Sequence, residues 1–170
     1  MDFREEWYNR MNMLSRIEAK IEQDRSSLKE KFDALKGRRV FTNGCFDLLH
    51  RGHVDYLCRA RDLGDHLIVA LNTDESVKRL KGPSRPVQTL EDRMFLMASL
   101  ECVSLVGCFD EQTPEELLSI LKPEIHVKGG DYRPDDLPEK RVIDSYGGRI
   151  EILPFVPGRS TTGIIQKLGG

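Results

Sequence analysis

Two histidines that stand three positions apart are the residues of this sequence best placed to carry out chemistry. His50 and His53 are separated by Arg51 and Gly52. On the first turn of a helix, residues three apart lie on one face, so both imidazoles can donate hydrogen bonds to a single phosphate. Gly52 removes a side chain where the phosphates of a ligand would approach the backbone. The spacing therefore predicts a group that binds phosphate and stabilises charge growing on it.

The segments on either side of this pair indicate a strand, a turn and the start of a helix. Residues 39–41 are typical of a short buried strand, and residues 54–60 carry apolar side chains at helical spacing. The first amides of a helix lack internal partners, and the helix dipole adds roughly half a positive charge there. Phosphate is the natural occupant of such a turn.

Two other interpretations of the histidine pair stay open, namely a metal site and a plain surface turn. Two imidazoles need further ligands to complete the four that zinc takes. The other two histidines, His66 and His126, fall on expected strands. We therefore predict no metal site.

Size and composition indicate one soluble domain with a sizeable core. The chain has 170 residues and a formal net charge of -2, so we expect no nucleic-acid partner. It has neither an apolar run of the roughly 18 residues that span a bilayer nor a start typical of a signal peptide. Its 4 cysteines include no CxxC pair, and we expect a reduced cytoplasmic protein.

The amino-terminal residues 2–36 are charged and helical in pattern. An apolar stripe at helical spacing is formed by Trp7, Met11, Leu14, Ile17 and Ile21. A capping box at Ser27 would start a second helix. We expect a helical segment over 1–36 that packs on a domain over 37–170, or that acts as a dimerising arm.

From residue 39 onward, apolar runs alternate with helical patterns. Further strands are expected at 66–72, 104–108, 125–128 and 149–153, and helices at 91–100, 114–121 and 161–168. Thr113 is the expected N-cap of the second of these helices, with Pro114 at its first position. This order predicts an α/β fold, a Rossmann-like doubly wound parallel sheet of about five strands. Ligands of such sheets bind beyond the carboxyl ends of the strands.

Other candidates for phosphate binding lie in a basic stretch and at two helix starts. Residues 78–86 read as a basic loop, which is either plainly solvated or a lid that brings Lys81 or Lys78 to a polyphosphate. Arg93 is either an exposed helix arginine or a phosphate ligand, and residues 160–162 could cap the last helix and bind phosphate together. Cys45 is expected to fill space rather than to act as a nucleophile.

Together, residues 42–47, 50–53 and 160–162 resemble the nucleotidyltransferase superfamily of the cytidylyltransferase type. Within it, residues 78–86 and 127–132 resemble the D-glycero-β-D-manno-heptose 1-phosphate adenylyltransferases. The resemblance covers about residues 27–168. In many bacteria this activity is one half of a bifunctional protein whose other half is a sugar kinase, and we expect the stand-alone form here.

The resemblance implies attack by a sugar 1-phosphate on the α-phosphate of ATP, giving an ADP-sugar and pyrophosphate, with Mg²⁺ present. The implied catalytic residues are His50, His53 and Lys81. The implied nucleotide-binding residues are Thr42, Asn43, Gly44, Cys45, Phe46, Lys78, Arg93, Gly129, Ser160, Thr161 and Thr162. The implied substrate-binding residues are Asp47, Asn72, Asp74, Asp131 and Tyr132.

One departure from related enzymes bears on the nucleotide. Glycerol-3-phosphate cytidylyltransferases carry an arginine shortly before the Ser-Thr-Thr, where this sequence reads Phe-Val-Pro-Gly over residues 155–158. ATP is therefore favoured over CTP. A CTP-dependent enzyme acting on a polyol or amino-alcohol phosphate, and a nucleotide-binding assembly module without turnover, stay open. We expect small-molecule substrates, no membrane partner and a homo-oligomer, most simply a dimer.

Overall fold

The fold is built on one parallel sheet of five strands. The computed structural model describes residues 12–154 and 161–168. The strands are β1 (Arg39–Gly44), β2 (His66–Asn72), β3 (Leu105–Phe109), β4 (Ile125–Gly129) and β5 (Arg149–Leu153). Their order is β3-β2-β1-β4-β5, and every pairing is parallel. The expected Rossmann-like fold is confirmed, and its strand order reverses between β1 and β4.

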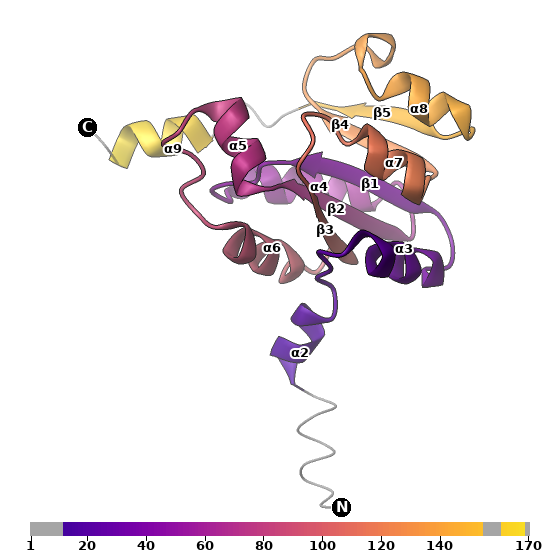
Figure 1. The fold of residues 1–170 in the computed structure, drawn as a ribbon, viewed down its shortest axis with the longest axis horizontal. Helices are drawn as coiled ribbons and strands as arrows, with labels where there is room; N and C mark the ends of the chain where they lie inside the picture. The colour runs from indigo at the N-terminus through magenta and orange to yellow at the C-terminus, as the bar shows by residue number, and fades with distance from the viewer. Residues whose placement is uncertain (1–11, 155–160, 169–170) are drawn as a thin grey trace, which may run out of the picture.

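Helices cover both faces of the sheet (Figure 1). They are α2 (Met13–Glu18), α3 (Arg25–Ala34), α4 (Arg51–Arg61), α5 (Asp74–Lys81), α6 (Leu90–Ala98), α7 (Glu115–Leu121), the 3-10 turn η1 (Pro134–Asp136), α8 (Lys140–Ser145) and α9 (Thr161–Leu168). Apolar side chains of α4 and α6 form one core cluster with the sheet. Side chains of α3, α7 and α8 form a second cluster on the other face.

Strand β2 lies between β1 and β3, and helices cover both of its faces, which explains why its sequence is a continuous apolar run. Leu67, Val69 and Leu71 belong to the cluster under α4 and α6. Ile68 and Ala70 belong to the cluster under α3 and α7. All five are 0% exposed, so neither face of the strand has room for a polar residue.

The amino-terminal segment differs from the expected pair of long helices. Helix α2 ends at Glu18, and Ile21 forms a parallel bridge with Val106 of β3. The prediction of one helical stripe as far as Ile21 is therefore wrong. Trp7 and Met11 of that stripe lie outside the described residues.

Helix α3 is part of the core rather than an appendage to it. It is capped by Asp24, whose side chain accepts a hydrogen bond from the amide of Ser27, so the predicted capping box at Ser27 is wrong. Leu28 and Phe32 are 1% and 0% exposed against the sheet. The division of the chain at residue 36 stays a prediction.

Three further details differ from the sequence-based expectations. Residues 78–81 form the last turn of α5 instead of a loop. Helix α7 is capped by Pro114 and begins at Glu115, one residue later than expected. Helix α8 was not expected. Within the described residues, no helix has both the length and the apolar character needed to cross a membrane.

Candidate active site

A cleft of about 740 Å³ lies at the carboxyl ends of the strands. Its walls come from the turn between β1 and α4, the end of α5, the loop after β4, and α9. The lining residues that the sequence singled out are Asn43, Gly44, Cys45, Phe46, Asp47, His50, Gly52, His53, Asn72, Lys81, Gly129, Tyr132 and Thr161. The cleft opens beside β1 and β4, where the strand order reverses and where ligands of doubly wound sheets bind.

The two histidines lie together in this cleft at the start of α4. His50 is the N-cap residue of the helix, and His53 lies in its first turn. Their rings are stacked with centroids 3.8 Å apart and planes inclined by 18°. Phe46, held at φ 44°, turns its ring edge-on to His53 at 5.2 Å. The predicted juxtaposition of two imidazoles at a helix start is present.

The surroundings of His53 favour its neutral form. Burial lowers the pKa of the imidazole from 6.5 to about 4, and the neighbouring His50 acts in the same direction. A hydrogen bond with the Leu48 backbone acts in the opposite direction and is smaller. A neutral imidazole still donates one N–H, so the pair can bind an anion while remaining free to gain a proton.

Residues at the end of β1 differ in what they face. The buried Thr42 hydroxyl can donate its one proton to the Val127 carbonyl at 3.0 Å while it accepts from the Tyr56 hydroxyl at 2.7 Å. Thr42 therefore ties β1 to α4 and β4. Cys45 lies 3.8 Å from the Asn72 side chain, and burial raises the pKa of its thiol. The thiol is thus not activated as a nucleophile, in agreement with a space-filling role.

Asp47, an expected substrate ligand, is engaged with the loop after α5. Its side chain is 1% exposed, and Oδ2 lies 2.5 Å from Nε of Arg85. Oδ1 accepts from the amides of Val87 and Gln88 at 2.8 and 3.1 Å. Both carboxylate oxygens therefore hold the loop between α5 and α6 against the histidine turn, and this loop places Arg85 in the cleft wall.

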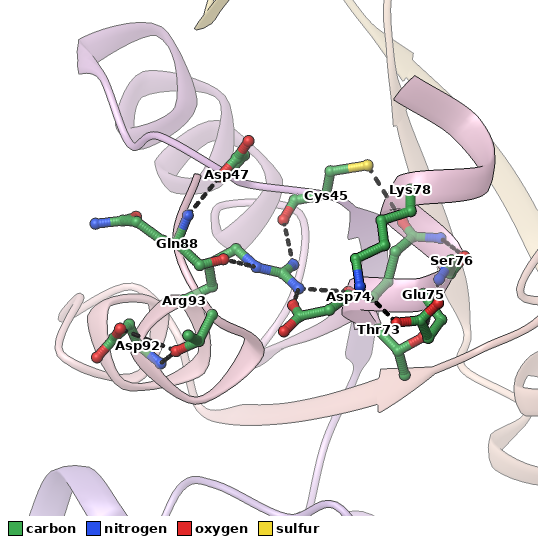
Figure 2. A network of polar contacts seen from close by, with 12 residues as sticks. Cys45, Asp47, Thr73, Asp74, Glu75, Ser76, Lys78, Gln88, Asp92 and Arg93 are labelled. Carbon is green, nitrogen blue, oxygen red and sulfur yellow. Dashed lines mark hydrogen bonds and ion pairs between the residues drawn. The ribbon is translucent and has the colours of Figure 1, made fainter. Parts of the chain in front are cut away.

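Arg93, an expected phosphate ligand, is instead at the centre of a buried network (Figure 2). Its guanidinium donates to the carbonyls of Gln88, Cys45 and Asn72 at 3.1, 2.7 and 2.9 Å. It also pairs with Asp74 at 2.7 Å. These contacts join the ends of β1 and β2 to α5 and α6, below the cleft. The phosphate-binding role of Arg93 and the substrate-binding role of Asp74 stay predictions.

The two lysines of α5 have different surroundings. Lys81 lines the cleft, whereas Lys78 forms an ion pair with Glu75 at 2.6 Å, as Figure 2 shows. At the other wall, Tyr132 lines the cleft and Asp131 is exposed to solvent. Thr161 begins α9 and lines the cleft. The expected ligand Ser160, and the side chain of Thr162, lie outside what the structure describes.

Several residues that line the cleft were missed at the sequence level. They are Tyr56, Leu80, Arg85, Gln112, Thr113, Pro114, Lys128, Leu137, Pro138 and Glu139. Lys128 could have been found, because it ends a predicted strand at the binding edge. Glu139 carries no local signal, because it follows β4 by ten residues and is the N-cap residue of a helix that was not expected. Over residues 12–154 and 161–168, no cluster of three or more His, Cys, Asp or Glu could hold a metal ion.

Comparison with known proteins identifies close relatives over most of the chain. It is 59% identical to the bifunctional protein HldE of Trichlorobacter lovleyi over 134 residues, which is 78% of this chain and 27% of that protein. It is 51% identical to the bifunctional protein HldE of Syntrophotalea carbinolica, with 85% and 30% covered. The chain thus spans less than a third of the length of these relatives.

Solved structures share the fold. A lipopolysaccharide core biosynthesis protein from Thermoplasma volcanium is 28% identical with a TM-score of 0.59, covering 71% of this chain and 98% of that one. A pantoate-beta-alanine ligase from Francisella tularensis has a TM-score of 0.57 at 16% identity, covering 84% and 69%, and shares the fold alone. The family model described as cytidylyltransferase-like matches residues 41–166. Together with the strand order and the paired histidines, this match shows that the chain belongs to the cytidylyltransferase-like family.

Proposed function

We propose that this protein transfers AMP from ATP to D-glycero-β-D-manno-heptose 1-phosphate, giving ADP-heptose and pyrophosphate for cell-surface polysaccharide synthesis. The observation that carries the proposal is the stacked pair of His50 and His53, with ring centroids 3.8 Å apart, in a cleft at the start of α4. The choice of ATP and heptose rests on the resemblance of residues 78–86 and 127–132 to heptose 1-phosphate adenylyltransferases. The identity of 59% to a bifunctional HldE protein supports it.

In this reaction a phosphate oxygen of the sugar attacks the α-phosphorus of ATP. The new P–O bond forms as the bond to the β-phosphate breaks, and pyrophosphate leaves with the electron pair. No covalent nucleophile is needed, so the protein contributes positioning and charge stabilisation. His50 and His53 would donate to the oxygens of the α-phosphate, and Lys81 would neutralise the polyphosphate from the end of α5.

A magnesium ion would neutralise part of the triphosphate charge when bound. The side chains that we assign to the phosphates are imidazoles and an ammonium group, and both oxygens of Asp47 are already engaged. This donor set fits an ion held mainly by phosphate oxygens and water. We therefore assign Mg²⁺ no protein cage.

The decisive experiment measures pyrophosphate release with Mg²⁺, offering ATP or CTP against a panel of sugar 1-phosphates that includes both heptose anomers. We expect turnover with ATP and the β-heptose 1-phosphate. Turnover with CTP and a polyol phosphate would overturn the substrate assignment. Tight nucleotide binding without turnover on any acceptor would instead support an assembly module.

We further propose that the protein is a homodimer that uses its amino-terminal segment. Met13 and Leu14, which are adjacent on α2, are 62% and 55% exposed and so offer apolar surface to a second copy. Replacement of both by serine should convert a dimer to a monomer in sedimentation measurements, because neither side chain belongs to the core. An unchanged mass would contradict this use of α2.

A further inference from the structure

Glu139 is a buried carboxylate in the wall of the cleft, and only one of its two oxygens is paired within the part of the chain that the structure describes. The residue is 1% exposed and precedes α8. Its Oε1 lies 2.6 Å from Nζ of Lys128. Its Oε2 is buried and has no hydrogen-bond partner among the residues that the structure describes. Such an unpaired buried acceptor is costly, and in a native protein it calls for a specific explanation.

Lys128 fixes where this carboxylate lies. It is on β4, and its ammonium group also donates to the Asn43 side chain at 3.2 Å, on the neighbouring strand β1. Both Lys128 and Glu139 line the cleft. The pair therefore stands at the reversal of strand order, the position where doubly wound sheets bind ligands.

The chemistry of the free oxygen defines what it can bind. A carboxylate only accepts hydrogen bonds, and it repels phosphate, so Oε2 suits a neutral part of a substrate that carries a donor. Both substrates of the proposed reaction carry such donors as hydroxyl groups, on the ribose of the nucleotide and on the sugar ring. The phosphates are assigned to the opposite set of groups, the histidines and Lys81.

We propose that Glu139 is a substrate-binding residue that accepts a hydrogen bond from one substrate hydroxyl through Oε2, and that Lys128 holds the carboxylate in position. The inference rests on the proposed adenylyl transfer and adds a specificity determinant to it. Because the hydrogen bond is charge-assisted, its loss should weaken binding of that substrate roughly tenfold to a hundredfold.

The test compares Glu139→Gln with the wild type on both natural substrates and on analogues that each lack one hydroxyl, such as 2′-deoxy-ATP, 3′-deoxy-ATP and deoxy sugar 1-phosphates. The glutamine keeps the shape and an acceptor for Lys128. We expect KM for one natural substrate to rise tenfold or more with a smaller change in kcat. The matching deoxy analogue should lose no further affinity in the variant, since its missing hydroxyl has already removed the contact.

Glu124→Gln is the matched control. Glu124 directly precedes β4 and pairs at 2.5 Å with Arg39, the first residue of β1, so this pair lies at the amino ends of the same two strands and away from the cleft. This variant should leave both KM values unchanged. Turnover by the wild type tests the proposed function itself. If the wild type does not turn over, the proposed function fails, whereas the role of Glu139 is tested by comparing the variant with the wild type.

Two outcomes would overturn the assignment. One is a Glu139→Gln protein whose KM values match those of the wild type. The same conclusion follows if the substitution weakens binding of a natural substrate and of each of its deoxy analogues by the same factor. The other needs no variant and so does not depend on folding: if removal of each hydroxyl in turn costs the wild type less than threefold, no hydroxyl contact of this kind exists. The deoxy nucleotide and deoxy sugar arms identify which substrate supplies the donor.

Discussion

The imidazole rings of His50 and His53 lie face to face, with centroids 3.8 Å apart and planes inclined by 18°. Burial disfavours a charged imidazole at this position, and the neighbouring ring of His50 adds to the effect, so that the pKa of His53 falls to about 4. His53 is therefore neutral near pH 7 in the ligand-free protein. An anionic phosphate placed beside it would act in the opposite direction and raise its pKa.

Nucleotide binding should consequently take up protons. As the pKa of His53 rises from about 4 on binding, the complex holds more protons than the free protein, so affinity for ATP should fall as pH rises through the pKa of the complex. Calorimetric titration with ATP in two buffers of different ionisation heat measures the uptake. His53→Ala should reduce this uptake and lower kcat by on the order of a hundredfold.

His66→Asn is the control for this prediction, because His66 lies at the amino end of β2 and its ring nitrogen is 3.0 Å from the Lys36 carbonyl. It should alter neither proton uptake nor kcat. Equal binding heats in both buffers, or a His53→Ala enzyme within threefold of the wild type, would contradict the role assigned to His53.

The two lysines of α5 provide a second matched comparison. Lys81 lines the cleft, whereas Lys78 is paired with Glu75 at 2.6 Å. Lys81→Ala should lower kcat/KM for ATP by roughly tenfold or more, the effect of losing one charge-assisted contact to phosphate. Lys78→Ala should change it by less than about threefold. Steady-state kinetics at fixed Mg²⁺ measure both, and equal losses would favour the nucleotide-binding role that the resemblance implies for Lys78.

The sequence was informative where burial alone decides the structure. The run over residues 66–72 is apolar because β2 is covered on both faces, and its bounds as a strand were predicted without error. The histidine turn was found because its spacing is local. In both cases the neighbours along the chain carry the signal.

The sequence was uninformative where distant segments meet. Leu14, Ile17 and Ile21 have helical spacing, yet the chain leaves the helix because Lys20 and Glu22 exchange backbone hydrogen bonds with Val106 at 2.8 and 2.9 Å. Likewise, Glu139 lines the cleft beside Lys128, with which it pairs across eleven residues. Such pairings are tertiary, and no local pattern records them.

His126 should destabilise the protein, increasingly so at acid pH. The residue is 0% exposed, its ring lies 5.6 Å from Phe41, and neither ring nitrogen has a hydrogen-bond partner in the described part of the chain. Burial, helped by Lys128, lowers its pKa from 6.5 to about 3. The unfolded chain therefore binds a proton that the folded protein does not, so stability is lost as pH falls from 6.5 toward 3.

His126→Leu should raise the free energy of unfolding by about 1–3 kcal/mol at pH 8, where only the unpaired polar atoms matter. At pH 5.5 the gain should be about 1 kcal/mol larger, because the variant binds no proton there on unfolding. Urea denaturation at both pH values measures this. His126→Gln separates the two effects: it keeps an unpaired polar side chain and so should gain little at pH 8, but it should show the same extra gain of about 1 kcal/mol at pH 5.5 because glutamine binds no proton. An identical pH dependence in all three proteins would contradict the argument.

Arg93 should matter for folding more than for nucleotide affinity. Its side chain is 0% exposed, and its donors reach Cys45, Asn72, Gln88 and Asp74. Arg93→Ala removes a buried guanidinium and leaves three backbone carbonyls and the partly exposed Asp74 without this donor, so the free energy of unfolding should fall by about 3–5 kcal/mol. Arg93→Lys should also destabilise the protein, because an ammonium group cannot reproduce the planar fork of donors.

Arg79→Ala is the control for Arg93, since Arg79 pairs with Asp110 on the surface and its loss should cost no more than about 1 kcal/mol. Denaturant unfolding separates the two sites, and ATP titration of Arg93→Lys tests the competing role. If Arg93 bound the β- and γ-phosphates directly, the lysine variant would unfold like the wild type and bind ATP more weakly. If Arg93 instead holds the ends of β1 and β2 together, the free energy of unfolding of the lysine variant should fall. Its folded fraction should then bind ATP with an affinity close to that of the wild type.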